Sequence, residues 1–232
     1  MITLREIKES FLQLLFPHIC AGCGRDIIHE RTSLCIRCMD AMPETNFERF
    51  YGNPVEKTFW GRLPLHSASA QFYFTKESLM QRLMHQLKYK GHRELGLQLG
   101  RVMGQQLLHS QRIIPDALIP LPLFPAREKR RGYNQATLLC EGISEVMKIP
   151  VLDKIITRPQ HTETQTRKGR VERWKNMEGK FILIDQAAIQ NKHLLLIDDV
   201  ITTGATLEAC GNELLKANGV QLSVATLCIA SR

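Results

Sequence analysis

Two adjacent aspartates, Asp198 and Asp199, follow a short aliphatic run and precede a turn of small residues. The run covers residues 194–197, and it is typical of a strand buried on both faces in a parallel sheet. Open α/β sheets bind ligands in the crevice beyond the carboxyl ends of such strands. A turn with hydroxyls and free backbone N–H groups at a helix start suits a phosphate. The turn consists of Thr202, Thr203, Gly204, Ala205 and Thr206.

The structural alternative for this segment is a buried strand followed by an N-capped helix. The combination of two acids with the turn at this spacing favours a ligand site instead. The segment resembles the signature of type I phosphoribosyltransferases, which bind 5-phosphoribosyl-1-pyrophosphate. The resemblance implies that Asp198 and Asp199 are catalytic residues that hold the ribose hydroxyls. It also implies that residues 202–206 cradle the 5′-phosphate and that Mg²⁺ accompanies the diphosphate.

Two Cys-x-x-Cys pairs lie near the amino terminus, with eleven residues between them. Four thiolates at this spacing can hold one tetrahedral zinc ion, and a shell of four thiolates leaves no open position for catalysis. Two redox motifs or two disulfides are the alternatives, although the chain shows no thioredoxin-like strand before either pair. We therefore expect a structural zinc ribbon. Its ligands are Cys20, Cys23, Cys35 and Cys38.

Positive charge gathers in two segments of a chain whose net charge is +8. Residues 125–135 contribute +3 and residues 158–175 contribute +4. Such concentration predicts a polyanionic ligand, and both pyrophosphate and nucleic acid qualify. A solvated basic surface is the alternative interpretation.

The first basic segment follows a proline-rich strand end, where phosphoribosyltransferases have a pyrophosphate loop. It resembles, more narrowly, the ComF family of competence-associated proteins, in which the pattern PxPL…R…RG(F/Y)NQ recurs. The resemblance implies that Arg127, Arg131, Tyr133, Asn134 and Gln135 bind substrate, and guanidinium groups suit phosphate oxygens. Asn134 also fits as the cap of the following helix. Pro122 is a candidate for a cis peptide bond.

The second basic segment, residues 158–176, has no apolar periodicity, as is typical of a functional lid or of disorder. The resemblance implies a hood that closes over the site, with Lys168 as a catalytic group and Arg167 and Arg170 as ligand contacts. Lys88 belongs to a further ComF-like stretch of the form LKYxG and is a candidate ligand contact. Its alternative role is to stabilise the dipole of the helix that it ends.

Strands and helices alternate through the second half of the chain, which predicts an α/β fold with a mostly parallel sheet and flanking helices. We expect a helix and the zinc ribbon over 1–43, a linker over 44–64 and a phosphoribosyltransferase-like domain over 65–232. The expected strands cover 68–74, 116–121, 151–157, 180–184, 193–197 and 221–229. The expected helices cover 77–89, 94–109, 134–147 and 203–218.

The first residues lack the apolar core of a signal peptide, and the chain contains no apolar run of the roughly 18 residues that a membrane span needs. We therefore expect a cytoplasmic protein. The ComF resemblance implies binding of phosphoribosyl pyrophosphate and single-stranded DNA during natural transformation, with a competence helicase or other DNA-uptake proteins as partners. Two alternatives stay open: an active phosphoribosyltransferase with an unidentified nitrogen acceptor, and a sensor of phosphoribosyl pyrophosphate without turnover.

Overall fold

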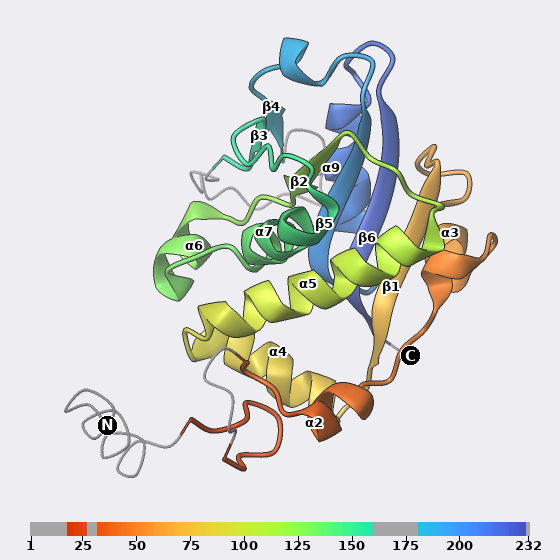
Figure 1. Cartoon of the computed structure of the whole chain (residues 1–232). Helices are drawn as coiled ribbons and strands as arrows, with labels where there is room; N and C mark the ends of the chain where they lie inside the picture. Colours follow the sequence, from red (N-terminus) through yellow and green to blue (C-terminus); the bar gives the residue numbers. More distant parts are fainter. Residues whose placement is uncertain (1–17, 27–31, 160–180, 231–232) are drawn as a thin grey trace, which may run out of the picture.

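Four parallel strands form the main sheet, in the order β1-β6-β5-β2 (Figure 1). The computed structural model describes residues 18–26, 32–159 and 181–230. Because the strands are parallel, their carboxyl ends share one edge of the sheet. The strands are β1 (Ser67–Phe74), β2 (Ala117–Pro120), β5 (His193–Ile201) and β6 (Gln221–Ala230).

Helices cover both faces of this sheet, as Figure 1 shows. On one face lie α4 (Leu79–Tyr89), α5 (Arg93–Ser110) and α7 (Gln135–Met147). On the other lies α9 (Ala205–Leu214). The predicted α/β architecture with a mostly parallel sheet and flanking helices is therefore confirmed.

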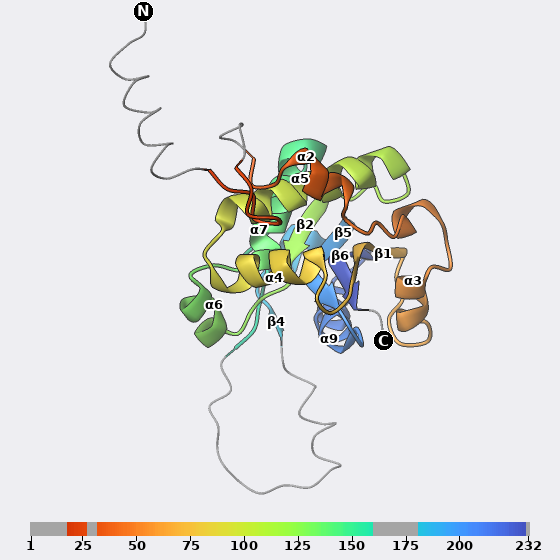
Figure 2. The ribbon, with the colours of Figure 1, turned by 90° about the horizontal axis from the view of Figure 1, so that it is seen from below.

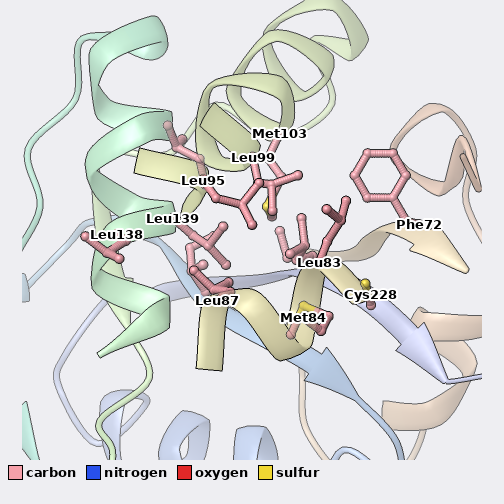
Figure 3. Close-up of a cluster of buried hydrophobic side chains, with 14 of the residues drawn as sticks. Phe72, Leu83, Met84, Leu87, Leu95, Leu99, Met103, Leu138, Leu139 and Cys228 are labelled. Carbon is pink, nitrogen blue, oxygen red and sulfur yellow. The ribbon is translucent and has the colours of Figure 1, made fainter. Parts of the chain in front are cut away.

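The side chains of β5 alternate between the two faces, as strand geometry requires. Leu195 and Ile197 pack into the cluster formed with α4, α5 and α7, part of which is drawn in Figure 3. Leu194 and Leu196 pack into the cluster that contains the buried face of α9. This alternation continues to the two acids, so neighbouring carboxylates emerge on opposite faces of the sheet.

Several boundaries differ from the sequence prediction. β5 continues to Ile201, so both acids lie inside the strand rather than after it. The predicted strand over 151–157 is reduced to a bridge between Leu118 and Val151 and the short β3 (Ile156–Thr157). β3 pairs antiparallel with β4 (Ile182–Leu183), outside the main sheet. α9 ends four residues before the predicted boundary at 218, and a turn with Gly219 at positive φ follows.

The basic loop expected after β2 begins with a helix, α6 (Pro125–Arg131). Pro125 occupies the first helical position, where its missing N–H costs nothing, and Gly132 ends the helix at φ 79°. The described residues contain no cis peptide bond, so the expectation for Pro122 was wrong. The helix arranges the arginines of this segment on a rigid element.

Residues 44–64, expected as a linker, contain two short helices, η1 (Phe47–Arg49) and α3 (Pro54–Phe59). Asn53 holds them together and is fully buried. Its amide nitrogen donates to the carbonyls of Phe47, Phe50 and Ala68, at 2.8–3.3 Å. Its amide oxygen accepts from two backbone N–H groups at the start of α3. One side chain thus joins this segment to β1.

The cysteine segment packs against α4 and α5. Cys20, Leu34 and Cys38 are buried in the same cluster as the inner faces of these helices. The Gln98 side chain accepts a hydrogen bond from the Ser33 backbone N–H at 2.7 Å. A short helix, α2 (Ile36–Asp40), follows in this segment, and η2 (Ala187–Ile189) precedes β5. In the described part of the chain, none of the helices combines the length and the apolar composition that a membrane span needs.

Replacing Asn53 with Ala is expected to lower the free energy of unfolding by about 2–4 kcal/mol, because it removes a helix cap and leaves buried carbonyls unpaired. Urea denaturation measures this change. Asn212→Ala is the matched control, since Asn212 is exposed on α9. Equal stabilities of the two variants would contradict the role assigned to Asn53.

Candidate functional site

The two acids of β5 occupy the carboxyl edge of the sheet and have different partners. The Asp199 carboxylate forms an ion pair with Lys88, whose Nζ lies 3.0 Å from Oδ2. Asp198 accepts the backbone N–H of Asp199 at 2.7 Å. Asp198 also lies within electrostatic reach of Arg158 and of Cys210 on α9. Asp199 thus belongs to the α4 side of the edge, and Asp198 to the α9 side.

The surroundings of Asp198 perturb its ionisation. Burial, followed by the neighbouring negative charge of Asp199, raises the pKa of Asp198 to about 8. The Asp199 N–H, Lys88 and Arg158 oppose this rise without cancelling it. The Asp198 carboxyl group therefore favours its neutral form, which can donate a hydrogen bond, while the Asp199 side chain is paired with Lys88. This combination suits a pair of hydroxyl groups.

The turn after β5 leads directly into α9. Gly204 precedes the helix at φ 73°, and a Cβ atom there would lie 2.9 Å from the Phe59 ring, so the position requires glycine. Thr202 and Thr203 are exposed, and Ala205 and Thr206 begin the helix half-buried. The first backbone N–H groups of α9 have no acceptor within the helix, and a helix start of this kind suits an anion; the Ala205 N–H lies 3.5 Å from the Thr203 hydroxyl oxygen, which accepts from it. The predicted phosphate turn therefore has suitable geometry.

Arg62 supports this turn, although the sequence analysis did not select it. It lies just after α3, and its guanidinium donates to the Thr203 carbonyl at 3.1 Å and pairs with Glu208 on α9. Arg62 also donates to the Thr58 carbonyl. Because it lies in the segment expected to be a linker, more than a hundred residues from the turn, no local pattern pointed to it.

The residues of the RGYNQ stretch divide into buried and accessible groups. The Tyr133 hydroxyl donates to the Leu87 carbonyl near the end of α4. Asn134 caps α7 by accepting the Ala136 N–H at 3.0 Å and donates to the Leu121 carbonyl. Both side chains are buried, and their polar groups face protein. The capping role considered for Asn134 is therefore confirmed.

Gln135 is also buried, and its amide oxygen accepts from the Arg131 guanidinium at 2.5 Å. This contact holds Arg131 beside the Tyr89 ring, with the guanidinium carbon 5.7 Å from the ring centroid. Arg127 is exposed on α6. Arg127 and Arg131 thus carry charge on α6 together with Lys129 and Arg130, while Gln135 holds Arg131 and Tyr133 binds the Leu87 carbonyl of α4. Figure 2 shows α6 beside the end of α4.

Arg158 is a further basic residue at the edge that the site prediction did not include. Its guanidinium stacks on the Phe124 ring at 3.6 Å and lies 5.1 Å from the centroid of the Phe181 ring. Burial and then the nearby charge of Arg127 lower the pKa of Arg158. Its Nε atom is buried without a hydrogen-bond partner among the described residues. Lys168, Arg167 and Arg170 lie outside the described residues, so their predicted roles stay predictions.

The four cysteines of the predicted ribbon meet at one point. Their sulfur atoms all lie within 4.8 Å of one another, and the sulfurs of Cys23 and Cys35 are 3.8 Å apart. A tetrahedral ion with Zn–S bonds of about 2.3 Å separates its sulfurs by about 3.8 Å, so the cluster is compatible with zinc. Burial tends to raise the pKa of Cys20, but backbone N–H groups of Cys35, Cys23 and Gly22 hold it at about 6. This environment favours a thiolate.

The perturbed pKa of Asp198 predicts a pH-dependent effect of Asp198→Asn. The pKa of Asp198 is higher in the folded chain than in the unfolded chain, so the folded chain disfavours the ionised carboxylate. The free energy of unfolding therefore falls as the pH rises from the pKa of the unfolded chain towards the folded-state pKa of about 8. The variant, neutral at every pH, is expected to be more stable than the wild type by about 1–3 kcal/mol near pH 9. The advantage shrinks towards pH of about 5.

Thermal unfolding at both pH values measures this difference. Asp153→Asn is the control, because Asp153 is exposed in a turn away from the acid pair. A stability difference for Asp198→Asn that does not change with pH would contradict the ionisation behaviour described above.

Comparison with known proteins gives relatives that match most of the chain. The DNA utilization protein YhgH of Escherichia coli O157:H7 is 32% identical over 215 residues, which cover 90% of this chain and 89% of the relative. Competence protein F of Haemophilus influenzae is 30% identical over 207 residues, which cover 89% and 81%. Competence protein ComFC of Bacillus subtilis is 29% identical over 158 residues, which cover 66% and 61%. No family model matches the chain.

Solved structures with similarity to the chain include phosphoribosyltransferases. The allosteric regulatory enzyme of purine biosynthesis is 16% identical with a TM-score of 0.40, and the match covers 56% of this chain and 25% of that structure. The purine phosphoribosyltransferase from Pyrococcus horikoshii is 17% identical with a TM-score of 0.34, and the match covers 57% and 72%. The identity and coverage of the curated relatives decide the family: the chain belongs to the ComF family of competence-associated proteins, together with YhgH and competence protein F.

Proposed function

We propose that this chain binds phosphoribosyl pyrophosphate together with Mg²⁺ at the carboxyl edge of the main sheet. The observation that carries the proposal is the juxtaposition of the Asp198–Asp199 pair with the glycine-capped turn at the start of α9. The pair suits the two ribose hydroxyls, and the turn suits the 5′-phosphate. The strand and the helix are adjacent in the chain, so the two parts of the site are held at a fixed separation.

The diphosphate end of the ligand is assigned to the basic side of the edge. Arg127 and Arg131 on α6, together with Arg158, bring positive charge to this side. Mg²⁺, when bound with the ligand, would neutralise the diphosphate and link it to the ribose oxygens. The oxygen donors of the acid pair fit a hard cation of this kind. Lys168, Arg167 and Arg170 complete the proposal as hood residues.

Turnover requires a nitrogen acceptor in addition to the phosphoribosyl donor. Binding without turnover therefore forms the core of the proposal, and phosphoribosyl transfer remains a separate hypothesis. Release of pyrophosphate in the presence of candidate amines distinguishes the two.

The second part of the proposal is that the chain binds single-stranded DNA and acts in DNA uptake for natural transformation, with a competence helicase or other uptake proteins as partners. The family supports this part, because its relatives are named for competence and for DNA utilization. The basic surface of α6 adds electrostatic support: Lys129 and Arg130 are exposed beside Arg127. Exposed lysine and arginine side chains can neutralise the phosphates of a nucleic acid independently of its base sequence.

The double variant Asp198→Asn/Asp199→Asn is expected to bind phosphoribosyl pyrophosphate at least about tenfold more weakly, because it replaces both carboxyl groups and one hydrogen bond to a charged group is worth about 1.5–3 kcal/mol. Isothermal titration calorimetry with Mg²⁺, and again with a chelator, measures the affinity. Asp153→Asn should bind like the wild type. A wild-type chain that shows no magnesium-dependent binding would refute the ligand assignment.

We further propose that the four-cysteine cluster holds one structural zinc ion. Cys20 and Cys38 belong to the buried cluster beneath α4, so loss of the ion is expected to loosen the packing of this helix as well. Purified protein should contain one equivalent of zinc, and a chelator should lower the melting temperature.

Cys23→Ser should lose the zinc, whereas Cys140→Ala should retain it, because Cys140 is buried in α7 away from the cluster. Elemental analysis by mass spectrometry measures both variants. A metal-free wild type, or equal metal loss in the two variants, would contradict the proposal.

A further inference from the structure

The exposed face of α4 lies between two cavities. The first, about 500 Å³, separates α4 from the cysteine segment and is lined by residues that include Arg82, His85 and His92. We call it the cysteine-side cavity. The second, about 320 Å³, lies where the end of α4 meets α6 and is lined by Lys88, Tyr89, Gly91, Arg130 and Arg131. We call it the α6-side cavity.

Two rings on α4 connect these cavities. His85 and Tyr89 are four residues apart, on the same side of the helix, with their ring centroids 5.1 Å apart. His85 lines the first cavity and Tyr89 the second. Tyr89 is 58% exposed, and the guanidinium carbon of Arg131 lies 5.7 Å from its ring centroid. The two rings therefore lie side by side on α4, one lining each cavity, and we call the two cavities with the α4 surface between them the groove.

The α6-side cavity has the charge expected of an anion site. Three of its five lining residues are cationic, and the lining described for the two cavities includes no acidic residue. Asp199, the acid nearest to Lys88, is already paired with it. The Nε atom of Arg131 is buried without a hydrogen-bond partner among the described residues. A ligand with phosphate oxygens would satisfy this donor and the surrounding charge.

The groove combines stacking rings with phosphate-binding cations, and this combination is characteristic of sites for unpaired nucleotides. We propose that single-stranded DNA lies along α4, with one base stacked on Tyr89 and the next on His85. Arg130 contacts the phosphate beside Tyr89, and Arg82 contacts the phosphate beside His85. This inference rests on the proposed binding of single-stranded DNA and assigns that binding to a particular surface.

Lys88 places this groove next to the proposed phosphoribosyl site. Its side chain lines the α6-side cavity while its ammonium group pairs with Asp199. The Tyr133 hydroxyl, bound to the Leu87 carbonyl, fixes the end of α4 at this point. The bound strand would therefore pass directly beside the acid pair.

Tyr89→Leu tests the assignment, because it removes the ring and keeps an apolar side chain on an exposed helix position. Fluorescence anisotropy with a labelled oligothymidylate, over a range of salt concentrations, measures affinity. Tyr89→Leu should bind at least about fivefold more weakly than the wild type, as expected for the loss of one base–aromatic stack. Tyr89→Phe should restore the affinity, since a phenyl ring stacks equally well.

A plot of the logarithm of the DNA-binding constant against the logarithm of the salt concentration has a slope that counts phosphate contacts. Arg130→Gln is expected to reduce the magnitude of this slope by about 0.7, the value for one phosphate contact of a single strand. Tyr51→Leu is the matched control: Tyr51 is 72% exposed and lies in the chain between η1 and α3, and α3 lies away from α6 in Figure 1. This control should bind DNA like the wild type. Calorimetry of phosphoribosyl pyrophosphate should give unchanged affinity for Tyr89→Leu and Arg130→Gln.

The outcomes separate this inference from the proposed function. If the wild type binds the oligonucleotide and Tyr89→Leu binds equally well, the groove assignment is wrong while DNA binding stands. If the wild type binds no oligonucleotide at any salt concentration, both the assignment and the proposed DNA binding fail. Two further results would overturn the assignment. One is an affinity for duplex DNA equal to that for the single-stranded oligonucleotide, and the other is an affinity for a thymidine mononucleotide equal to that for the oligonucleotide. Neither result requires a strand of unpaired bases along α4.

Discussion

The alternation of side chains along β5 is the constraint on which the site depends. A strand that is buried on both faces must send successive side chains to opposite sides, so Asp198 and Asp199 cannot share one environment. Asp199 faces α4 and is neutralised by Lys88, whereas Asp198 faces the α9 side and retains its proton up to a pKa of about 8. Two chemically identical residues thereby acquire different partners.

The position of α4 follows from contacts that the ComF motifs make with each other. Tyr133 of the RGYNQ stretch binds the carbonyl of Leu87 in the LKYxG stretch, and the Arg131 guanidinium lies over the Tyr89 ring. Several residues of these motifs therefore have a structural role, and those that line the α6-side cavity are Lys88, Tyr89 and Arg131. A motif that is read as a ligand-binding signature can thus consist largely of residues that hold two helices together.

Close packing of the helices supports the same arrangement. Gly100 on α5 faces Gly142 on α7, and a Cβ atom on Gly100 would lie 2.4 Å from the Leu139 carbonyl oxygen. The two backbones can approach only because both positions lack side chains. This contact sets the layer against which α4 packs, as Figure 3 shows for Leu83, Leu87 and Leu99. The helix α4, which forms the groove, therefore packs against a rigid layer formed by α5 and α7.

Local sequence determined the parts of this protein that depend on neighbouring residues. The aliphatic run of β5, the helical spacing of α4 and α5, the cysteine spacing and the glycine before α9 each follow from short-range geometry, and the parallel α/β class follows from their order. Tertiary structure alone decided which distant groups meet. The support of the phosphate turn by Arg62, the stacking of Arg158 on Phe124 and the pairing of Lys88 with Asp199 each join segments more than thirty residues apart. No local pattern encodes such contacts, because they arise only when the whole sheet and its helices pack together.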